Sequence, residues 1–423
     1  TVYLYDIDLE AAKKNEKIGN CIKDIEGCKS QWKYKAVETE KEALEGADFV
    51  IISILPGTFD EMESDVHIPE KYNIYQSVGD TAGPGGILRA LRTIPMFEEI
   101  AENIKKYCPD AWVINYTNPM TICVKTLYKV FPEIKAFGCC HEVFGTQKLL
   151  VNALEDIKGI KDVKREDIKV NVVGVNHFTW LTKAQYKDID IFPVYREFAE
   201  KYKDNGFVKK SDENWMNKYF SCSEKVKIDL FLRYGSIAAA GDRHLTEFCP
   251  GDWYLKDKET VEKWGFALTP VSWRKDDLEK RLERSERLYS GEEKFELKET
   301  GEEGVQQIRA LLGLGDLVTN VNIPNYGQIP NLPIGAVVET NACFRANSLN
   351  PVFAGNIPQA IYPLISRVCG EQEQVVDCAL NRDLDGVFNA FAADPNMCIS
   401  VSDARKLFDE MVDNTKEYLK MYF

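Results

Sequence analysis

The stretch Ala47-Asp-Phe-Val-Ile-Ile-Ser-Ile54 decides the fold class of this sequence. It is an almost continuous apolar run, which is typical of a parallel strand buried on both faces of a sheet. Two similar runs follow at Ala111–Asn115 and Ile134–Gly138, and helical segments such as Ile87–Tyr107 lie between the runs. This alternation predicts a doubly wound, Rossmann-like α/β domain over residues 1–150.

The strand predicted at the start of the chain, Val2–Tyr5, ends in Asp6-Ile-Asp8. In a dinucleotide-binding unit, a carboxylate at the end of the second strand bonds the ribose hydroxyls. Asp6 and Asp8 are therefore candidate NAD contacts, as are Ser53 and Asn115 at the ends of later strands. The alternative for the acids is an N-cap of the next helix. A first strand with a glycine-rich phosphate loop would precede them, and it is absent from this sequence.

Two predicted strands lead into residues that bind metals. Cys140 follows the run Ile134–Gly138, and His177 follows the run Val170–Val175. Because ligands bind at the carboxyl ends of parallel strands, we expect Cys140 and His177 to meet on one divalent metal with positions open for substrate. The alternative is packing, since free cysteine is among the most buried residue types and the chain has 12.

The composition limits the classes of partner. A net charge of −14 and a pI of about 5.0 argue against binding to nucleic acid or to an anionic membrane. No apolar run is long enough to span a membrane, and the scattered cysteines without an export signal predict a cytoplasmic protein with reduced thiols. The pattern changes after Gln147, which predicts a second domain at 151–423 for catalysis, substrate binding and oligomerisation.

The motifs, taken in order, resemble those of glycoside hydrolase family 4, from the first residue to about Val338. These motifs are Asp6-Ile-Asp8, Gly85-Gly86-x-x-Arg89-x-x-Arg92, Asn115-x-x-Asn118-Pro119, Cys140-His141, Asn176-His177 and Gly241-Asp242-Arg243-His244. The resemblance implies a lactate/malate dehydrogenase-like NAD domain, a C-terminal α+β catalytic domain, and a homodimer or homotetramer. It also implies two cofactors, NAD and a divalent metal, usually Mn²⁺.

The reaction that the resemblance implies is a redox-assisted elimination, outside the usual two-carboxylate scheme of glycosidases. NAD takes a hydride from C3 of the sugar, and the metal polarises the resulting ketone as a Lewis acid. A base then removes the acidified C2 proton and the C1 substituent is eliminated. Water adds and the steps reverse.

The resemblance also assigns roles to residues. Cys140 and His177 match the metal ligands, and His141 matches the acid that protonates the leaving group. The tyrosine that serves as base in the phospho-glycosidase branch is missing, so Asp242 is the candidate base and Tyr234 the second choice.

The remaining residues of these motifs are assigned to the substrate. Asn118 and Asn176 are expected near the sugar hydroxyls and Arg89 near the distal end of the substrate. The motifs look most like those of α-galacturonidases, whose substrate carries a carboxylate at C6. Arg243 could bind this carboxylate in bidentate fashion, and His244 could donate a further hydrogen bond or approach the metal.

Three alternatives stay open at this point. The first is an α-galactosidase of the same family, because a C6 hydroxyl could accept the same donors. The second is a dehydrogenase of the lactate/malate type, which would need no metal. The third is a non-catalytic binding protein, suggested only by the absent phosphate loop.

Overall fold

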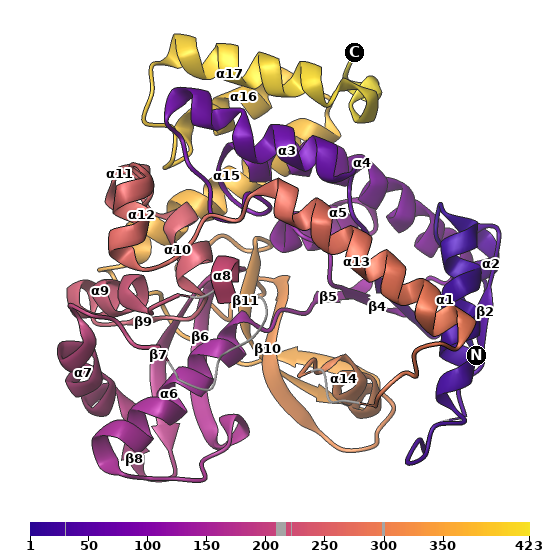
Figure 1. Ribbon diagram of the computed structural model, residues 1–423, viewed down its shortest axis with the longest axis horizontal. Helices are drawn as coiled ribbons and strands as arrows, with labels where there is room; N and C mark the ends of the chain where they lie inside the picture. Colours follow the sequence, from indigo (N-terminus) through magenta and orange to yellow (C-terminus); the bar gives the residue numbers. More distant parts are fainter. Residues whose placement is uncertain (30, 209–216, 221, 298–300) are drawn as a thin grey trace.

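The computed structural model describes residues 1–423 except 30, 209–216, 221 and 298–300 (Figure 1). Within these residues, the largest sheet has six strands in the order β12-β11-β10-β5-β4-β3. Its strands are β3 (Phe49–Ile52), β4 (Trp112–Asn115), β5 (Lys135–Gly138), β10 (Leu317–Pro324), β11 (Val337–Arg345) and β12 (Ser348–Pro351). The other strands are β1 (Val2–Leu4), β2 (Tyr34–Ala36), β6 (Ile168–Val175), β7 (Phe178–Tyr186), β8 (Ile189–Asp190) and β9 (Ile237–Ala238).

Helices cover these sheets. They are α1 (Leu9–Ile22), α2 (Glu40–Leu44), α3 (Phe59–His67), α4 (Gly83–Tyr107), α5 (Met120–Val130), α6 (Glu142–Lys158), α7 (Ile191–Tyr202), α8 (Asn217–Phe220), α9 (Lys225–Tyr234), α10 (Asp242–Phe248), α11 (Gly251–Tyr254), α12 (Lys258–Trp264), α13 (Val271–Ser290), α14 (Gly304–Leu311), α15 (Tyr362–Leu380), α16 (Leu384–Ala393) and α17 (Val401–Asn414). Among the described residues, no helix is both long enough and apolar enough to cross a membrane.

Strands β3, β4 and β5 are parallel neighbours, as the apolar runs predict. Their side chains pack with those of α4 and α5 in one hydrophobic core, which includes Ile52, Phe97, Val113, Leu127 and Ala136. Burial of apolar surface on the faces of the sheet stabilises this arrangement. The predicted α/β fold is therefore confirmed. Strands β1 and β2 form a separate parallel pair.

Helix α4 starts earlier than the helical segment Ile87–Tyr107 that the sequence predicts. The helix begins at Gly83, and the preceding loop packs tightly against its first turn. A Cβ on Gly86 would lie 2.4 Å from the carbonyl carbon of Thr81, and one on Gly85 would lie 2.8 Å from the oxygen of Gly79. Glycine is required because only a residue without Cβ allows such close backbone approach. The loop that carries Asp80 is thus held against the helix.

The main sheet takes strands from both halves of the chain. Strand β10 pairs antiparallel with β5, with Asn322 opposite Gly138, and also with β11. The predicted division at residue 150 falls inside α6, which leads from the first half into the second. The end of β5, where Cys140 follows, therefore lies beside strands of the second half.

Strand β6 belongs to a second sheet and not to the parallel one. The prediction of a strand at Val170–Val175 is correct, but β6 pairs antiparallel with β7 through the turn Asn176-His177. Both faces of β6 are buried: Val173 and Val175 lie in one core and Val172 in another. A continuous apolar run indicates burial on both faces, and here two separate cores produce it in an antiparallel strand.

The C-terminal helices α15, α16 and α17 pack against α4, which they cover together with α3 (Figure 1). Helix α13 runs along α3 and reaches α1 (Figure 1). Its sequence alternates acids and bases, a pattern typical of a solvated helix, and it is largely exposed after its first turn.

Candidate active site

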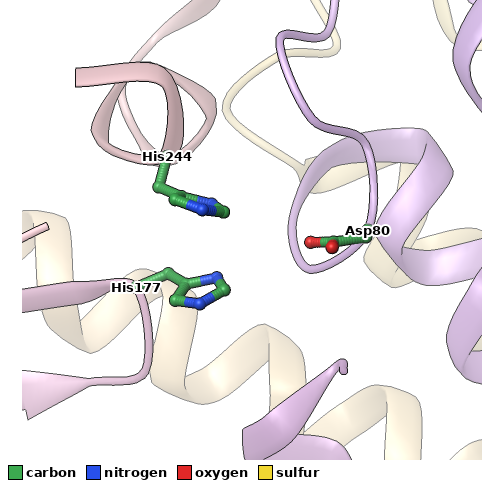
Figure 2. A group of neighbouring side chains, drawn as sticks. All are labelled: Asp80, His177 and His244. Atoms are coloured by element: carbon green, nitrogen blue, oxygen red, sulfur yellow. The ribbon is translucent and has the colours of Figure 1, made fainter. Parts of the chain in front are cut away.

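Three side chains from distant parts of the chain meet in one group: Asp80, His177 and His244 (Figure 2). Asp80 lies in the loop before α4, His177 in the turn between β6 and β7, and His244 on α10. One ligand atom from each residue lies within 4.8 Å of the other two. Two imidazoles and one carboxylate form a set of donors that suits divalent first-row metals, including manganese and iron.

His177 is held in the neutral form that metal binding requires. Burial, followed by the nearby imidazole of His244, lowers the pKa of His177 to about 3. Its Nδ1 lies 3.1 Å from Oγ1 of Thr81, which leaves Nε2 as the ring nitrogen that could coordinate. His177 also has φ of +62°, a left-handed conformation that is rare outside glycine. Such strain at a binding position is a common sign of a functional constraint.

His244 adds a second, half-buried imidazole with an open nitrogen. Its ring centroid lies 3.9 Å from that of His177. Nδ1 of His244 is buried and has no hydrogen-bond partner among the described residues, while Nε2 lies 3.7 Å from Oε1 of Glu142. Since a buried polar atom without a partner is costly, the open nitrogen fits a site completed by a ligand. The donors present therefore fit a metal ion.

Asp80 is ionised in this setting and its loop is held in place. Burial alone would raise the pKa of Asp80, but the guanidinium of Arg89 and the imidazoles of His244 and His177 hold it well below its usual value. Oε1 of Glu247 on α10 accepts hydrogen bonds from the backbone nitrogens of Val78 (2.7 Å) and Gly79 (2.9 Å). Sequence reasoning missed Asp80, because an acid within a glycine-rich stretch resembles an ordinary turn residue.

Cys140 lies outside this group. Burial raises the pKa of its thiol well above the usual value, and the carboxylates of Glu339 and Glu142 raise it further. The side chain of Asn176, next to His177, hydrogen-bonds to the thiol. The predicted pair of Cys140 and His177 thus lies on adjacent segments, but the group with close ligand atoms pairs His177 with Asp80 and His244. A metal-ligand role for Cys140 stays a prediction.

The first turn of α6 places His141 and Glu142 next to the site. Burial would raise the pKa of Glu142, but the nearby imidazoles of His244 and His177 and the backbone N–H of Gly241 lower it to about 2. That N–H donates to Oε2 of Glu142 at 2.7 Å, which ties α6 to the start of α10. His141 is more exposed, and its Nδ1 lies 2.9 Å from Oε1 of Glu302. This hydrogen bond raises the pKa of His141.

Two of the predicted substrate contacts carry buried polar atoms without partners among the described residues. Oδ1 of Asn118 and Oδ1 of Asn176 are buried and accept no hydrogen bond from a described residue. Arg89 is buried on α4, and its Nε donates to the backbone oxygen of Asn118 at 3.0 Å. Asn118, Asn176 and Arg89 come from three separate elements and are predicted substrate contacts. The two amide oxygens, and the end of the Arg89 guanidinium that bonds no described residue, would allow this role.

Arg243 does not fit its predicted role as the main carboxylate ligand. Its Nε donates to the backbone oxygen of Ala267 at 3.1 Å, and one Nη donates to the backbone oxygen of Ser77 at 2.6 Å and also to Thr269. A bidentate contact needs two free donors on one edge of the guanidinium, and these are in use. Arg243 instead connects α10 to the loop that carries Asp80.

The two candidate bases also point elsewhere. Both carboxylate oxygens of Asp242 accept backbone hydrogen bonds at the start of α9, from Val226 at 3.2 Å and Lys227 at 3.1 Å. Tyr234, on the last turn of α9, packs edge-on to Trp180, and its hydroxyl accepts from Arg233 at 3.3 Å. Neither geometry supports proton transfer at the Asp80–His177–His244 group.

The predicted NAD contacts lie at or after the ends of strands, and some are exposed while others are buried. Asp6 and Ser53 are exposed after β1 and β3. Asp8 is the N-cap of α1 and accepts from the nitrogen of Ala11 at 3.1 Å, the alternative that the sequence leaves open. Asn115 is fully buried and bonds both backbone groups of Thr117, so it shapes the turn after β4.

Comparison with known proteins agrees with this geometry. Residues 1–156 match the model of family 4 glycosyl hydrolases, and residues 172–397 match the model of their C-terminal domain. An α-galacturonidase of Thermoanaerobacterium saccharolyticum is 67% identical over 99% of this chain and 90% of its own length. The α-galacturonidase of Bacillus subtilis is 53% identical over 97% of this chain and 90% of its own length.

Solved structures of other proteins share the fold of this chain. A Bacillus subtilis protein described as a glucosidase superposes with a TM-score of 0.92 at 52% identity, over 97% of this chain and 92% of its own. A 6-phospho-α-glucosidase from gut microorganisms, solved with NAD and Mn²⁺, shares the fold with a TM-score of 0.79 at 21% identity, over 98% of this chain and 91% of its own. On this sequence and structural evidence, the chain belongs to family 4 of the glycosyl hydrolases.

Proposed function

We propose that this chain is an α-galacturonidase, which hydrolyses glycosides of α-linked galacturonate. Relatives that carry this name and are 53–67% identical over almost the whole chain support the proposal. The observation that carries it is local charge. In a chain with a net charge of −14, the buried or half-buried guanidinium groups of Arg89, Arg243 and Arg274 gather around Asp80. This excess of positive charge fits an anionic sugar.

The proposed cofactors are NAD and Mn²⁺, which are bound in solved structures of the same fold. Asp80, His177 and His244 would hold the metal, with Cys140 as a further candidate ligand, and the exposed Asp6 and Ser53 would contact NAD. When bound, NAD supplies reversible oxidation at C3 of the sugar and the metal supplies Lewis acidity that makes C2–H acidic.

The chain's own residues would bind the substrate and move one proton. We assign Asn118 and Asn176 to the sugar hydroxyls, because their Oδ1 atoms are buried acceptors that have no partner in the described part of the chain. We assign proton donation to the leaving oxygen at C1 to His141, because the hydrogen bond that its ring donates to Glu302 raises the pKa of His141 and favours the protonated imidazole. Asp242 is assigned to holding α9 and α10 together, through its two backbone contacts.

The experiment that tests the proposal measures hydrolysis of digalacturonate and of an aryl α-galactoside by the same preparation. NAD and Mn²⁺ are each added and withheld. We expect cleavage of the galacturonide only when both are present. Cleavage of the galactoside alone would replace the proposed substrate by a neutral sugar, and cleavage of neither substrate under any condition would reject a glycosidase activity for this chain.

We also propose that the enzyme acts in the cytoplasm as a homodimer or homotetramer. Support for the compartment comes from the scattered free cysteines, which suit a reducing environment. Size-exclusion chromatography with light scattering measures the assembly, and a mass of one chain at micromolar concentration would reject it.

A further inference from the structure

Helix α13 carries one arginine that differs from the others on the same helix. Arg281 and Arg284 are exposed, and they pair with Asp277 at 2.6 Å and Glu293 at 2.7 Å. Arg274, on the first turn, is half-buried, and its Nε is buried without a hydrogen-bond partner among the described residues. A buried guanidinium nitrogen without an acceptor is unfavourable, so a ligand that supplies one would bind with advantage.

The charges around Arg274 are those of the active site. Asp80 is the strongest opposite charge acting on Arg274, and Arg89 is a like charge that acts on it. Glu247 is a further acid nearby, but burial raises its pKa to about 7, so it balances less than one full positive charge at neutral pH. Two further acids act on these arginines, but each has an arginine partner of its own: Asp65 pairs with Arg92 and Asp277 with Arg281. Asp80, which is also a proposed metal ligand, is therefore the acid that Arg89 and Arg274 share.

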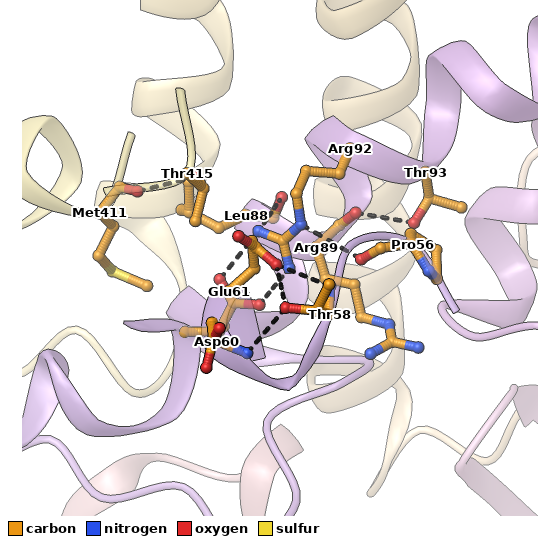
Figure 3. A network of polar contacts seen from close by, with 12 residues as sticks. Pro56, Thr58, Asp60, Glu61, Leu88, Arg89, Arg92, Thr93, Met411 and Thr415 are labelled. Atoms are coloured by element: carbon orange, nitrogen blue, oxygen red, sulfur yellow. Dashed lines mark hydrogen bonds and ion pairs between the residues drawn. The ribbon is translucent and has the colours of Figure 1, made fainter. Parts of the chain in front are cut away.

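The neighbouring arginines are already committed. Arg92 forms a bidentate ion pair with the buried Asp65, and Arg243 donates to backbone oxygens of the loop and of Ala267. Arg89 uses Nε on the backbone oxygen of Asn118, and Figure 3 shows its guanidinium extending away from the Arg92 network. Arg89 and Arg274 are thus the arginines beside Asp80 that have donors to offer.

We propose that Arg274, together with Arg89, binds the C6 carboxylate of the substrate and thereby selects galacturonides over galactosides. This proposal rests on the proposed function. A carboxylate offers two oxygens to guanidinium groups and compensates their charge. A galactoside has a neutral hydroxyl at C6, which would leave two like charges facing each other inside the site. A bound galactoside would therefore leave a buried charge unpaired, which costs more free energy than leaving a neutral polar group unpaired.

The test compares Arg274→Met and Arg274→Lys with wild type, and uses Arg281→Met as the matched control on the same helix. For each protein, kcat and KM are measured on an aryl α-galacturonide and an aryl α-galactoside with NAD and Mn²⁺. Binding is measured without turnover, as the shift of Tm on addition of galacturonate or of galactose.

For Arg274→Met we expect kcat/KM on the galacturonide to fall by about 100-fold or more, the usual effect of truncating one partner of a buried charge pair. The galactoside rate should change little or rise, so the ratio of the two substrates should move by a similar factor. The Tm shift by galacturonate should disappear, and Arg274→Lys should restore part of it. Arg281→Met should behave as wild type.

Equal losses on both substrates, or a galacturonate shift that survives in Arg274→Met, would overturn the role of Arg274. If wild type does not cleave the galacturonide, the proposed function fails instead. The Tm measurement then still decides whether Arg274 binds the carboxylate.

Discussion

Replacing Asp65 by Asn removes the charge partner of Arg92, a buried arginine on α4, the helix that also carries Arg89. The side chains of Asp65 on α3 and Arg92 on α4 are 0% and 1% exposed. Nη1 of Arg92 donates to Oδ1 of Asp65 at 3.0 Å, and Nη2 donates to Oδ2. Figure 3 shows the Arg92 guanidinium between Pro56 and Leu88, whose backbone oxygens it also reaches at 3.4 Å. Removing one partner of such a pair costs about 3–5 kcal/mol, because the other charge stays buried.

The assay is urea denaturation of wild type, Asp65→Asn and the double variant Asp65→Leu/Arg92→Met. We expect Asp65→Asn to lower the free energy of unfolding by about 3–5 kcal/mol, and the double variant to lose much less because no unpaired charge remains. The matched control is Asp316→Asn, whose partner Arg345 lies at 3.0 Å with both side chains 63% exposed. An exposed pair contributes about 0–1 kcal/mol. A loss for Asp65→Asn no larger than that of the control would refute the reasoning.

The other predictions concern the site. Asp80→Asn and His244→Ala should each weaken Mn²⁺ binding, measured by calorimetry, at least 10-fold. An undiminished Mn²⁺ affinity in both variants would exclude Asp80 and His244 as metal ligands. The affinity of Cys140→Ser in the same assay decides whether the thiol also binds the metal. Asp242→Asn should keep kcat within about 10-fold of wild type, whereas loss of a general base would lower it by about 10²–10⁴-fold. The pKa of Glu247, raised by burial to about 7, means that the folded protein keeps a proton that the unfolded chain releases above about pH 4.5. The stability that the protonated Glu247 contributes is therefore lost as pH rises from about 4.5 to 7. Glu247→Gln should flatten the pH dependence of Tm in this interval, and an unchanged curve would contradict the raised pKa of Glu247.

The strands of the parallel sheet could be predicted from the sequence because burial on both faces leaves a continuous apolar run. The same signal appears at Val170–Val175, where the strand is antiparallel and two different cores cover its faces. An apolar run reports burial and not the direction of the neighbouring strand. The sequence therefore placed His177 correctly after a strand, but at the wrong sheet edge.

The side chains of the site were harder to predict, because their roles depend on which donors and acceptors are already used. Arg243 lies in the motif Gly241-Asp242-Arg243-His244, yet its donors already bond backbone oxygens. Arg274 lies in a helix that alternates acids and bases, a pattern typical of solvent exposure, yet its Nε is buried without a partner among the described residues. Which donors already form hydrogen bonds is determined by tertiary packing between α10, α13 and the loop before α4, and a local sequence pattern does not show this packing.

Helix α10 explains how two distant segments form the proposed metal site. It supplies His244 to the group directly, while Arg243 and Glu247 on the same helix bond the backbone of Ser77, Val78 and Gly79. These residues immediately precede Asp80, so one short helix carries one ligand and fixes the loop that carries another. Asp242, at its first position, bonds α9 through two backbone nitrogens and anchors the helix in turn. The distance between Asp80 and His244 is therefore set by hydrogen bonds formed within the chain itself. A site held in this way is preorganised for its ligand, and it explains why the motif Gly241-Asp242-Arg243-His244 serves the active site although most of its side chains point elsewhere.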